Sequence, residues 1–395
     1  MRKVLFIVVL IPVFAAAGWW YFREQPLPNY GPAYREYAYI TNGKSNTVSV
    51  IDLRTFEPAK TIPVGVSPTG IAANGKKNEI YVVNTGSNNV SLIDAERNAV
   101  VATIGVHGRP YFIDVTEDGK RAYVANSGSA NVSIIDLEKR LVVGNVRVGS
   151  EPGLARASPD GATVVVSNRA DDTVSLIDAG LLRVRATLPV CQHPEDIVIL
   201  PDSSKAFVAC SGSSQVAAIA LAGNRNGEFA GDRVLALLDV GKTPVSLALK
   251  PDGGELVVCN FDSDSISFVE TGNNEVGSST TIGQHPVHAV VTRDNSRLYA
   301  SNFGSDNVAV YDIDMGRRVG TVQVGSRPDA LALSNDERYL LVLDTQAGDV
   351  TVIQKRNPRK LEPSEYSLLT MIPVGLQPNS IVVKSFMTIK PLPAK

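Results

Sequence analysis

The sequence predicts an all-β fold, an eight-bladed β-propeller with four strands in each blade, preceded by an N-terminal apolar helix. The first observation is a repeat. Segments such as YITN, YVVN and YVAN begin at residues 39, 81, 123, 165, 207, 257, 299 and 341, so their starts lie 42 residues apart with one step of 50. Second, each repeat holds short runs rich in Val, Ile and Tyr between turn residues, which indicates strands joined by tight turns. Third, the repeats show no sustained helical period. A unit of about 40 residues with four strands is typical of a propeller blade.

The two ends of the array predict how the ring closes. The N-terminal copy begins at its second strand, residues 37–42, whereas the chain ends with a lone first strand, NSIVVKSF, after Pro378. We therefore expect residues 379–384 to pair with residues 37–42, which leaves no open sheet edge. Repeat counting leaves a seven-bladed ring with one unpaired unit open as the alternative.

The sequence before the repeats predicts a targeting segment. Arg2 and Lys3 precede an apolar run over residues 4–22, which is long enough to cross a bilayer as a helix. Residues 1–23 are therefore interpreted as a membrane anchor, or alternatively as a signal peptide cleaved near the AAA at residues 15–17. Both interpretations export the protein to an extracytoplasmic location. The proline-rich residues 24–37 are expected to be an extended linker, residues 38–386 the propeller and residues 387–395 a C-terminal tail.

The composition excludes one class of partner. The net charge is −2, and Lys and Arg are scattered along the chain, so nucleic acid binding is not expected. With 44% hydrophobic residues, the chain can bury a large core.

The candidate site lies on one face of the ring. In a propeller, loops from the fourth strand of one blade to the first strand of the next share a face with the loops between second and third strands, around the mouth of the central channel. All four histidines, His107, His193, His285 and His288, fall in or just after the first class of loop. Imidazole is a common metal and haem ligand, so this face is a candidate ligand site. The predicted ligand-binding residues are Arg109, Tyr111, Glu151, His193, Glu195, His285, His288 and Arg327, with Phe112, Asp196 and Asp329 beside them.

An alternative interpretation of this face stays open. The loop positions before each proline are exposed and variable, so polar residues collect there without a shared function. The chain has no HExxH motif, no His pair at i, i+4 and no zinc-type Cys spacing, so no metal is expected. The Asn and Asp residues that recur from blade to blade are expected to satisfy turns rather than to form a site.

The cysteines suggest one disulfide. Cys191 replaces a loop Gly and Cys210 replaces the strand-ending Asn of the same blade, which brings both to one rim and makes a disulfide feasible. The alternatives are three independent core cysteines, or a ligand cluster of Cys191, His193 and Cys210. With three cysteines, one thiol is left unpaired.

The repeat resembles a known family. The Tyr-Val-x-Asn strand, the SNNVSLID segment at residues 87–94 and the Val-Gly-x-x-Pro loop are similar to the YVTN repeat family of extracytoplasmic propellers, which includes YncE-like proteins. The resemblance covers residues 38 to about 384. It implies the fold but no single activity, because binding, surface and haem-handling proteins all use this repeat. More distantly, the blade number and the histidines resemble the haem d1 propellers of cytochrome cd1.

The predicted function is a scaffold that binds a protein or small molecule at the channel mouth without catalysis and without a cofactor. One alternative is a haem d1-related binding or biosynthesis propeller, in which haem would be bound, and another is a lactonase-like hydrolase. The chain has no CxxCH for covalent haem and no Gly-x-Ser-x-Gly or phosphate loop. Two insertions, residues 221–233 and 355–367, lie between third and fourth strands and are candidate partner contacts on the opposite face.

Overall fold

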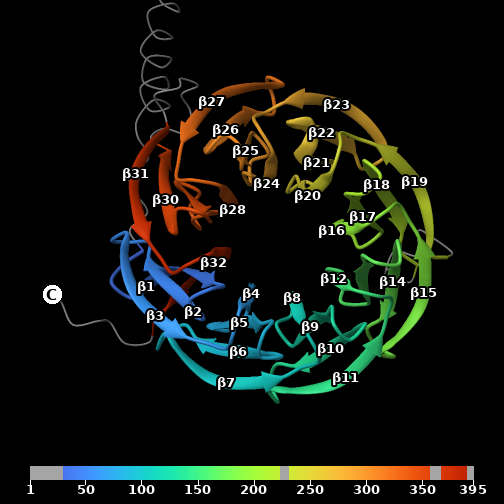
Figure 1. The fold of residues 1–395 in the computed structure, drawn as a ribbon, viewed down its shortest axis with the longest axis horizontal. Helices are drawn as coiled ribbons and strands as arrows, with labels where there is room; N and C mark the ends of the chain where they lie inside the picture. The colour runs from blue at the N-terminus through green and yellow to red at the C-terminus, as the bar shows by residue number, and fades with distance from the viewer. Residues whose placement is uncertain (1–29, 223–230, 356–365, 389–395) are drawn as a thin grey trace, which may run out of the picture.

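A computed structural model describes residues 30–222, 231–355 and 366–388 (Figure 1). Within these residues, eight antiparallel four-stranded sheets surround a common axis, and the one short 3-10 helix is Phe261–Ser263. The predicted all-β fold with eight blades is confirmed, and the seven-bladed alternative is wrong.

Each blade has the same strand order from the axis outward. The first strands are innermost: β4 (Pro68–Ala73), β8 (Pro110–Val115), β12 (Pro152–Ala157), β16 (Pro194–Ile199), β20 (Pro244–Leu249), β24 (Pro286–Val291), β28 (Pro328–Leu333) and β32 (Pro378–Met387). The second strands are β1 (Tyr34–Asn42), β5 (Glu79–Asn84), β9 (Arg121–Asn126), β13 (Thr163–Asn168), β17 (Lys205–Cys210), β21 (Glu255–Asn260), β25 (Arg297–Asn302) and β29 (Tyr339–Asp344).

The outer half of each blade completes the sheet. The third strands are β2 (Thr47–Asp52), β6 (Asn89–Asp94), β10 (Asn131–Asp136), β14 (Thr173–Asp178), β18 (Gln215–Ala220), β22 (Ser265–Glu270), β26 (Asn307–Asp312) and β30 (Asp349–Lys355). The fourth strands are β3 (Glu57–Pro63), β7 (Ala99–Gly105), β11 (Leu141–Arg147), β15 (Arg183–Pro189), β19 (Arg233–Asp239), β23 (Glu275–Thr281), β27 (Arg317–Gln323) and β31 (Tyr366–Pro373). Both insertions lie between a third and a fourth strand, as predicted. Each blade is named below by its first strand.

The ring closes through the two ends of the chain. The closing sheet has the order β3-β2-β1-β32, so three N-terminal strands join one C-terminal strand. Tyr37 lies opposite Lys384 and Ile40 opposite Ile381, which confirms the predicted pairing. The pairing also extends to Tyr34 and Met387. Strand β1 therefore includes residues 34–37, which the sequence assigns to the linker, and β32 includes Met387, which the sequence assigns to the tail, because residues 34–37 and 384–387 pair with each other.

The predicted N-terminal anchor helix is not tested by the described structure. The apolar segment at residues 4–22, predicted to be an anchor helix, lies outside the described residues. In the ranges that are described, no helix has the length and hydropathy needed to cross a membrane.

The core lies between neighbouring blades. Tyr81 and Leu92 of the β4 blade pack with Ile113 and Val124 of the β8 blade, and equivalent clusters fill the other blade junctions. The middle strands are covered on both faces, so their apolar residues run continuously instead of alternating, as in Glu79–Asn84. Burying each such side chain stabilises the fold by about 1.5–3 kcal/mol.

The recurrent Asn and Asp residues are structural, as predicted. Asn84 Nδ2 donates to Asn89 Oδ1 at 2.8 Å and to Ser91 Oγ at 2.9 Å, which ties the second strand to the third. A Cβ added at Gly65 would lie only 2.7 Å from Asn84 Cβ, so glycine is required above the Asn. Asp94 Oδ1 accepts the backbone N–H groups of the following turn.

Candidate functional site

The two classes of loop named above share one face of the ring. Ser127 N donates to Arg109 O at 3.0 Å, and Phe303 N donates to His285 O at 3.0 Å, so in each blade the loop before the first strand is joined to the loop after the second. This end of the ring is called the axial face below. It is the face on which the sequence predicts a ligand site.

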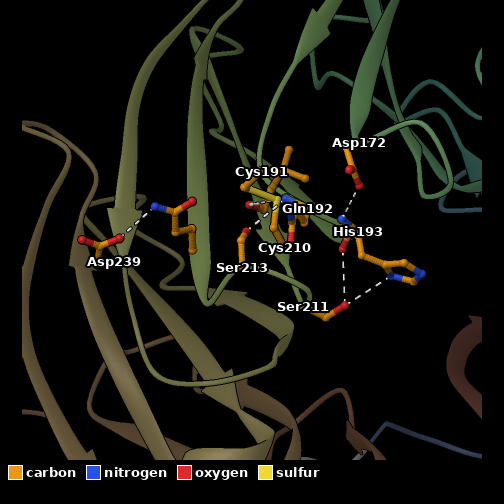
Figure 2. The surroundings of a disulfide bond; sticks show 10 residues. Asp172, Cys191, Gln192, His193, Cys210, Ser211, Ser213 and Asp239 are labelled. Carbon is orange, nitrogen blue, oxygen red and sulfur yellow. Dashed lines mark hydrogen bonds between the residues drawn. A yellow bond between two sulfur atoms is a disulfide. The ribbon is translucent and has the colours of Figure 1, made fainter.

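The residue before each loop proline has a left-handed backbone. Its φ lies between 47° and 54° in all eight blades, at Ser67, Arg109, Glu151, His193, Thr243, His285, Arg327 and Gln377. This conformation is unfavourable for residues other than Gly and needs compensation. His193 N donates to Asp172 Oδ1 at 2.8 Å (Figure 2). In the same way, Arg327 N donates to Asp306 Oδ1 at 2.8 Å. A side chain of the preceding blade therefore holds these candidate residues in place.

A polar cluster joins three successive blades on the axial face. Glu195 Oε1 lies 2.8 Å from His193 Nδ1, and Glu195 Oε2 lies 3.6 Å from Arg169 Nη1. The Arg169 guanidinium lies over the Tyr111 ring, 4.7 Å from its centroid. We call Tyr111, Arg169, His193 and Glu195 the polar cluster. Three of its four residues are predicted candidates.

Arg169 is the member that the sequence analysis missed. It occupies the position directly after the strand-ending Asn. An alignment of the repeats would have identified it, because no other blade has a charged residue at this position. In the eight blades this position holds Gly43, Thr85, Ser127, Arg169, Ser211, Phe261, Phe303 and Thr345. The Arg169 Nε is buried without a hydrogen-bond partner, and a Cβ at Gly153 would lie 3.0 Å from it. Gly153 thus leaves room for the guanidinium.

An aromatic cluster contains Phe261 and Phe303, which occupy the same position in their blades as Arg169. The His285 imidazole stacks on the Phe261 ring with centroids 4.4 Å apart and an interplanar angle of 8°. The Arg327 guanidinium lies 5.3 Å from the centroid of the Phe303 ring. His285 and Arg327 were predicted, whereas both Phe residues were missed. Each stack crosses a blade boundary, so the flat surfaces depend on the ring being assembled.

The innermost strands carry further charged groups. Arg156 lies 3.5 Å from Asp114 and over the Phe112 ring, and Asp114 Oδ2 accepts Ala157 N. Burial raises the pKa of Asp114, although Arg156 opposes this shift. Asp196 accepts the backbone N–H groups of Ile197 and Leu247. These carboxylates satisfy N–H groups of inner strands, which is a structural role that sequence reasoning did not identify.

Other candidates lie apart from both clusters. Glu151 is exposed, and its backbone carbonyl accepts Arg169 N at 3.3 Å. Arg109 packs over Gly128, and His107 Nδ1 lies 3.1 Å from Asn131 Nδ2. The described part of the chain contains no group of three His, Cys, Asp or Glu side chains placed to hold a metal ion.

The polar cluster does not have the geometry of a catalytic triad. Ser211 Oγ lies 3.3 Å from His193 Nδ1, the same nitrogen that contacts Glu195. In a Ser-His-acid triad the hydroxyl and the carboxylate contact opposite imidazole nitrogens. Ser211 is therefore not activated by this histidine in the present arrangement.

The predicted disulfide is confirmed. Cys191 and Cys210 are bonded, with Cα atoms 5.6 Å apart (Figure 2). The pair takes the place of the Gly-over-Asn contact of other blades and joins the segments that carry His193 and Ser211. Cys259 is the remaining thiol, and burial raises its pKa to about 12.

Comparison with known proteins agrees with this architecture. The family model for YncE-like β-propellers matches residues 15–159 and 154–363. The chain belongs to the YncE-like β-propeller family. No curated protein matches it significantly.

Solved structures share the fold. The dihydro-haem d1 dehydrogenase NirN, solved in complex with DHE, is 14% identical with a TM-score of 0.71, covering 91% of this chain and 77% of NirN. AztD from Citrobacter koseri is 15% identical with a TM-score of 0.66, covering 90% and 99% of the two chains. A candidate 6-phosphogluconolactonase from Bacteroides fragilis is 16% identical with a TM-score of 0.61, covering 91% and 100%. At these identities the likeness is to the fold alone.

Proposed function

We propose that this YncE-like propeller is a binding protein whose ligand, a small molecule or a protein segment, contacts the polar cluster on the axial face. One observation carries the proposal: side chains that depart from the repeat meet one another across three blades. Arg169 reaches both Tyr111 and Glu195, and Glu195 reaches His193. A ring of similar blades can be specific only where its blades differ.

The exposure of the cluster supports binding from solution. Tyr111 is 41% exposed and the His193 side chain 51% exposed, whereas the Arg169 side chain is 18% exposed and its Nε lacks a hydrogen-bond partner. A guanidinium pairs with carboxylates through parallel hydrogen bonds, so an anionic ligand group would compete with Glu195 for Arg169.

A second candidate function is binding of a haem d1-type tetrapyrrole. The flat stacks of His285 on Phe261 and of Arg327 over Phe303 favour a planar ligand with carboxylates. The fold similarity to NirN, which was solved with DHE, also supports it. The lactonase-like alternative rests on fold similarity alone, since Ser211 and Glu195 share one nitrogen of His193.

Export is part of the proposal. The apolar residues 4–22 and the Cys191–Cys210 disulfide favour an extracytoplasmic location, because disulfides persist in oxidising compartments. We further propose that residues 4–22 attach the protein to the membrane.

Haemin is a suitable probe, because it combines a flat surface with two carboxylates. We expect a saturable change in its absorption spectrum on titration with the full-length protein in detergent. Binding should weaken at least tenfold in Arg169→Ala and be lost in His193→Ala/His285→Ala. The matched control is His107→Ala, whose imidazole contacts Asn131 instead of either cluster. If haemin does not bind, the tetrapyrrole candidate fails. If it binds all variants equally, the assignment to this face is wrong.

A further inference from the structure

Two departures from the repeat occur together in the β12 blade. Gly153 follows the loop proline of this blade, and the residue at this position in the other blades is Thr69, Tyr111, Glu195, Val245, Val287, Asp329 or Asn379. Gly153 does not have a positive φ, so its backbone conformation does not require glycine. A Cβ at Gly153 would lie 3.0 Å from Arg169 Nε and 3.1 Å from Arg169 Cδ. The missing side chain therefore leaves the space that the Arg169 side chain occupies.

The Arg169 guanidinium lacks hydrogen-bond partners in this space. Its Nε is buried without a partner, and its Nη1 lies 3.6 Å from Glu195 Oε2, which is beyond hydrogen-bonding distance. Its other contact is with the Tyr111 ring, 4.7 Å from the centroid. Within the described chain, the five N–H donors of this side chain thus form no hydrogen bond. Since buried polar groups nearly always have partners, this arrangement favours a ligand that supplies them.

Glu195 does not satisfy these donors because another side chain engages it. Glu195 Oε1 lies 2.8 Å from His193 Nδ1, a much shorter contact than the one between Glu195 and Arg169. A ligand carboxylate can accept two parallel hydrogen bonds from a guanidinium, which Glu195 does not do. Such a carboxylate would lie beside the Glu195 carboxylate, and like charges at this distance repel each other. Glu195 therefore opposes the anion that Arg169 would attract.

The neighbouring rings indicate what the carboxylate is attached to. Tyr111 contacts Arg169 directly, and His193 contacts it through Glu195. Both rings are largely exposed on the axial face. A ligand anchored at Arg169 would place its next atoms against these rings, and aromatic rings pack favourably on one another. The complement of the cluster is a carboxylate joined to an aromatic ring.

We propose that Arg169 binds the carboxylate of an aromatic acid, and that Glu195 is a built-in competitor which this carboxylate replaces. The inference rests on the proposed function, because it names the ligand class and a specificity-determining residue for the same polar cluster. Glu195 selects for acids that bind Arg169 in the bidentate manner, since a weaker acceptor does not offset the repulsion.

Benzoate is the probe, and the chain's four histidines make a selective label practical. The full-length protein in detergent, with 13C-labelled histidine rings, is titrated with benzoate at pH 7.5 and followed by NMR. His193→Gln identifies the signals of His193. We expect these signals to shift and saturate with benzoate. They should not shift with benzamide, which keeps the ring but has no charge, or with benzylamine, which is a cation.

The variants test the two roles. Glu195→Gln should lower the Kd for benzoate at least tenfold, because it removes the competing charge and keeps the shape of the side chain. A purely structural Glu195 would give the opposite result, since loss of its contact with His193 would weaken the site. Arg169→Lys should raise the Kd at least tenfold, because an ammonium lacks the planar fork. The matched control is Glu151→Gln, which removes an exposed carboxylate from the same face and should leave the Kd unchanged.

Three results would overturn the inference. They are no benzoate-dependent shift of His193, an equal shift with benzamide, or an unchanged or raised Kd in Glu195→Gln. The haemin titration judges the proposed function separately. If haemin binding depends on Arg169 while benzoate causes no shift, the aromatic-acid inference fails and binding at the polar cluster stands. If neither probe responds to Arg169→Ala, both fail.

Discussion

Replacement of Asp344 by Asn should stabilise the protein in a strongly pH-dependent way. Six blades end their second strand in Asn, but the β28 blade has Asp344 there, fully buried below Gly325. Thr351 Oγ1 donates to Asp344 Oδ2 at 2.6 Å. The Oδ1 atoms of Asp344 and Asp349 have no other donor, so one proton between the two carboxyl groups satisfies both.

The expected magnitude follows from the protonation of this pair. Burial, with a contribution from Asp349, raises the pKa of Asp344 to about 8. The folded protein therefore keeps a proton that the unfolded chain releases above about pH 4. Stability contributed by this proton is present at low pH and is lost as the pH rises toward 8. The free energy of unfolding should fall by about 1.4 kcal/mol per pH unit, which amounts to about 3 kcal/mol between pH 5 and pH 7.

The carboxamide that Asp344→Asn introduces does not titrate, and it can donate to Asp349 as Asn84 donates to Asn89. The stability difference between variant and wild type should therefore grow by about 3 kcal/mol from pH 5 to pH 7. Calorimetric or urea unfolding of both proteins at several pH values measures it. Asn84→Asp is the mirror-image control and should destabilise the protein more as the pH rises. A difference that does not change with pH, or a variant less stable than wild type at pH 8, would refute the reasoning.

Three further predictions concern the ring. Deletion from Pro378 onward removes the strand that closes the sheet of β1, so calorimetry should show a lower and broader transition; an unchanged midpoint would argue against closure as a source of stability. Reduction of the Cys191–Cys210 disulfide removes the covalent closure of a loop with a sequence separation of 19, which should lower the free energy of unfolding measured in urea by about 3 kcal/mol. In Cys191→Ser, a reductant should leave that free energy unchanged. Lys205→Met should destabilise the protein by about 1–3 kcal/mol, since the buried Lys205 ammonium donates to Thr271 O in the next blade; equal stability would mean that this contact contributes nothing.

The sequence by itself determined the four-stranded repeat, and from that repeat it predicted the eight-bladed ring, its closure and the disulfide. The physical reason is that a strict repeat gives equivalent positions equivalent backbone surroundings. Once Pro378 is recognised as the start of a first strand, only the strand at residues 37–42 lacks such a partner. In the same way, Cys191 and Cys210 stand at positions that are in contact in other blades, as Gly65 and Asn84 are. Pairing of these positions is a property of the repeat, so it could be predicted without coordinates.

Only the tertiary structure decided which of the side chains that differ from blade to blade contact one another. The repeat places the Cα atoms of Arg109, Arg169 and Arg327 on one face, but it does not set the direction of a long side chain. Arg169 turns toward Tyr111 and Glu195, whereas Arg109 packs over Gly128. Likewise, His288 Nδ1 is buried without a hydrogen-bond partner among the described residues, which depends on the packing around it. These contacts depend on charge, desolvation and free space between blades far apart in sequence, and a periodic pattern carries no information about them.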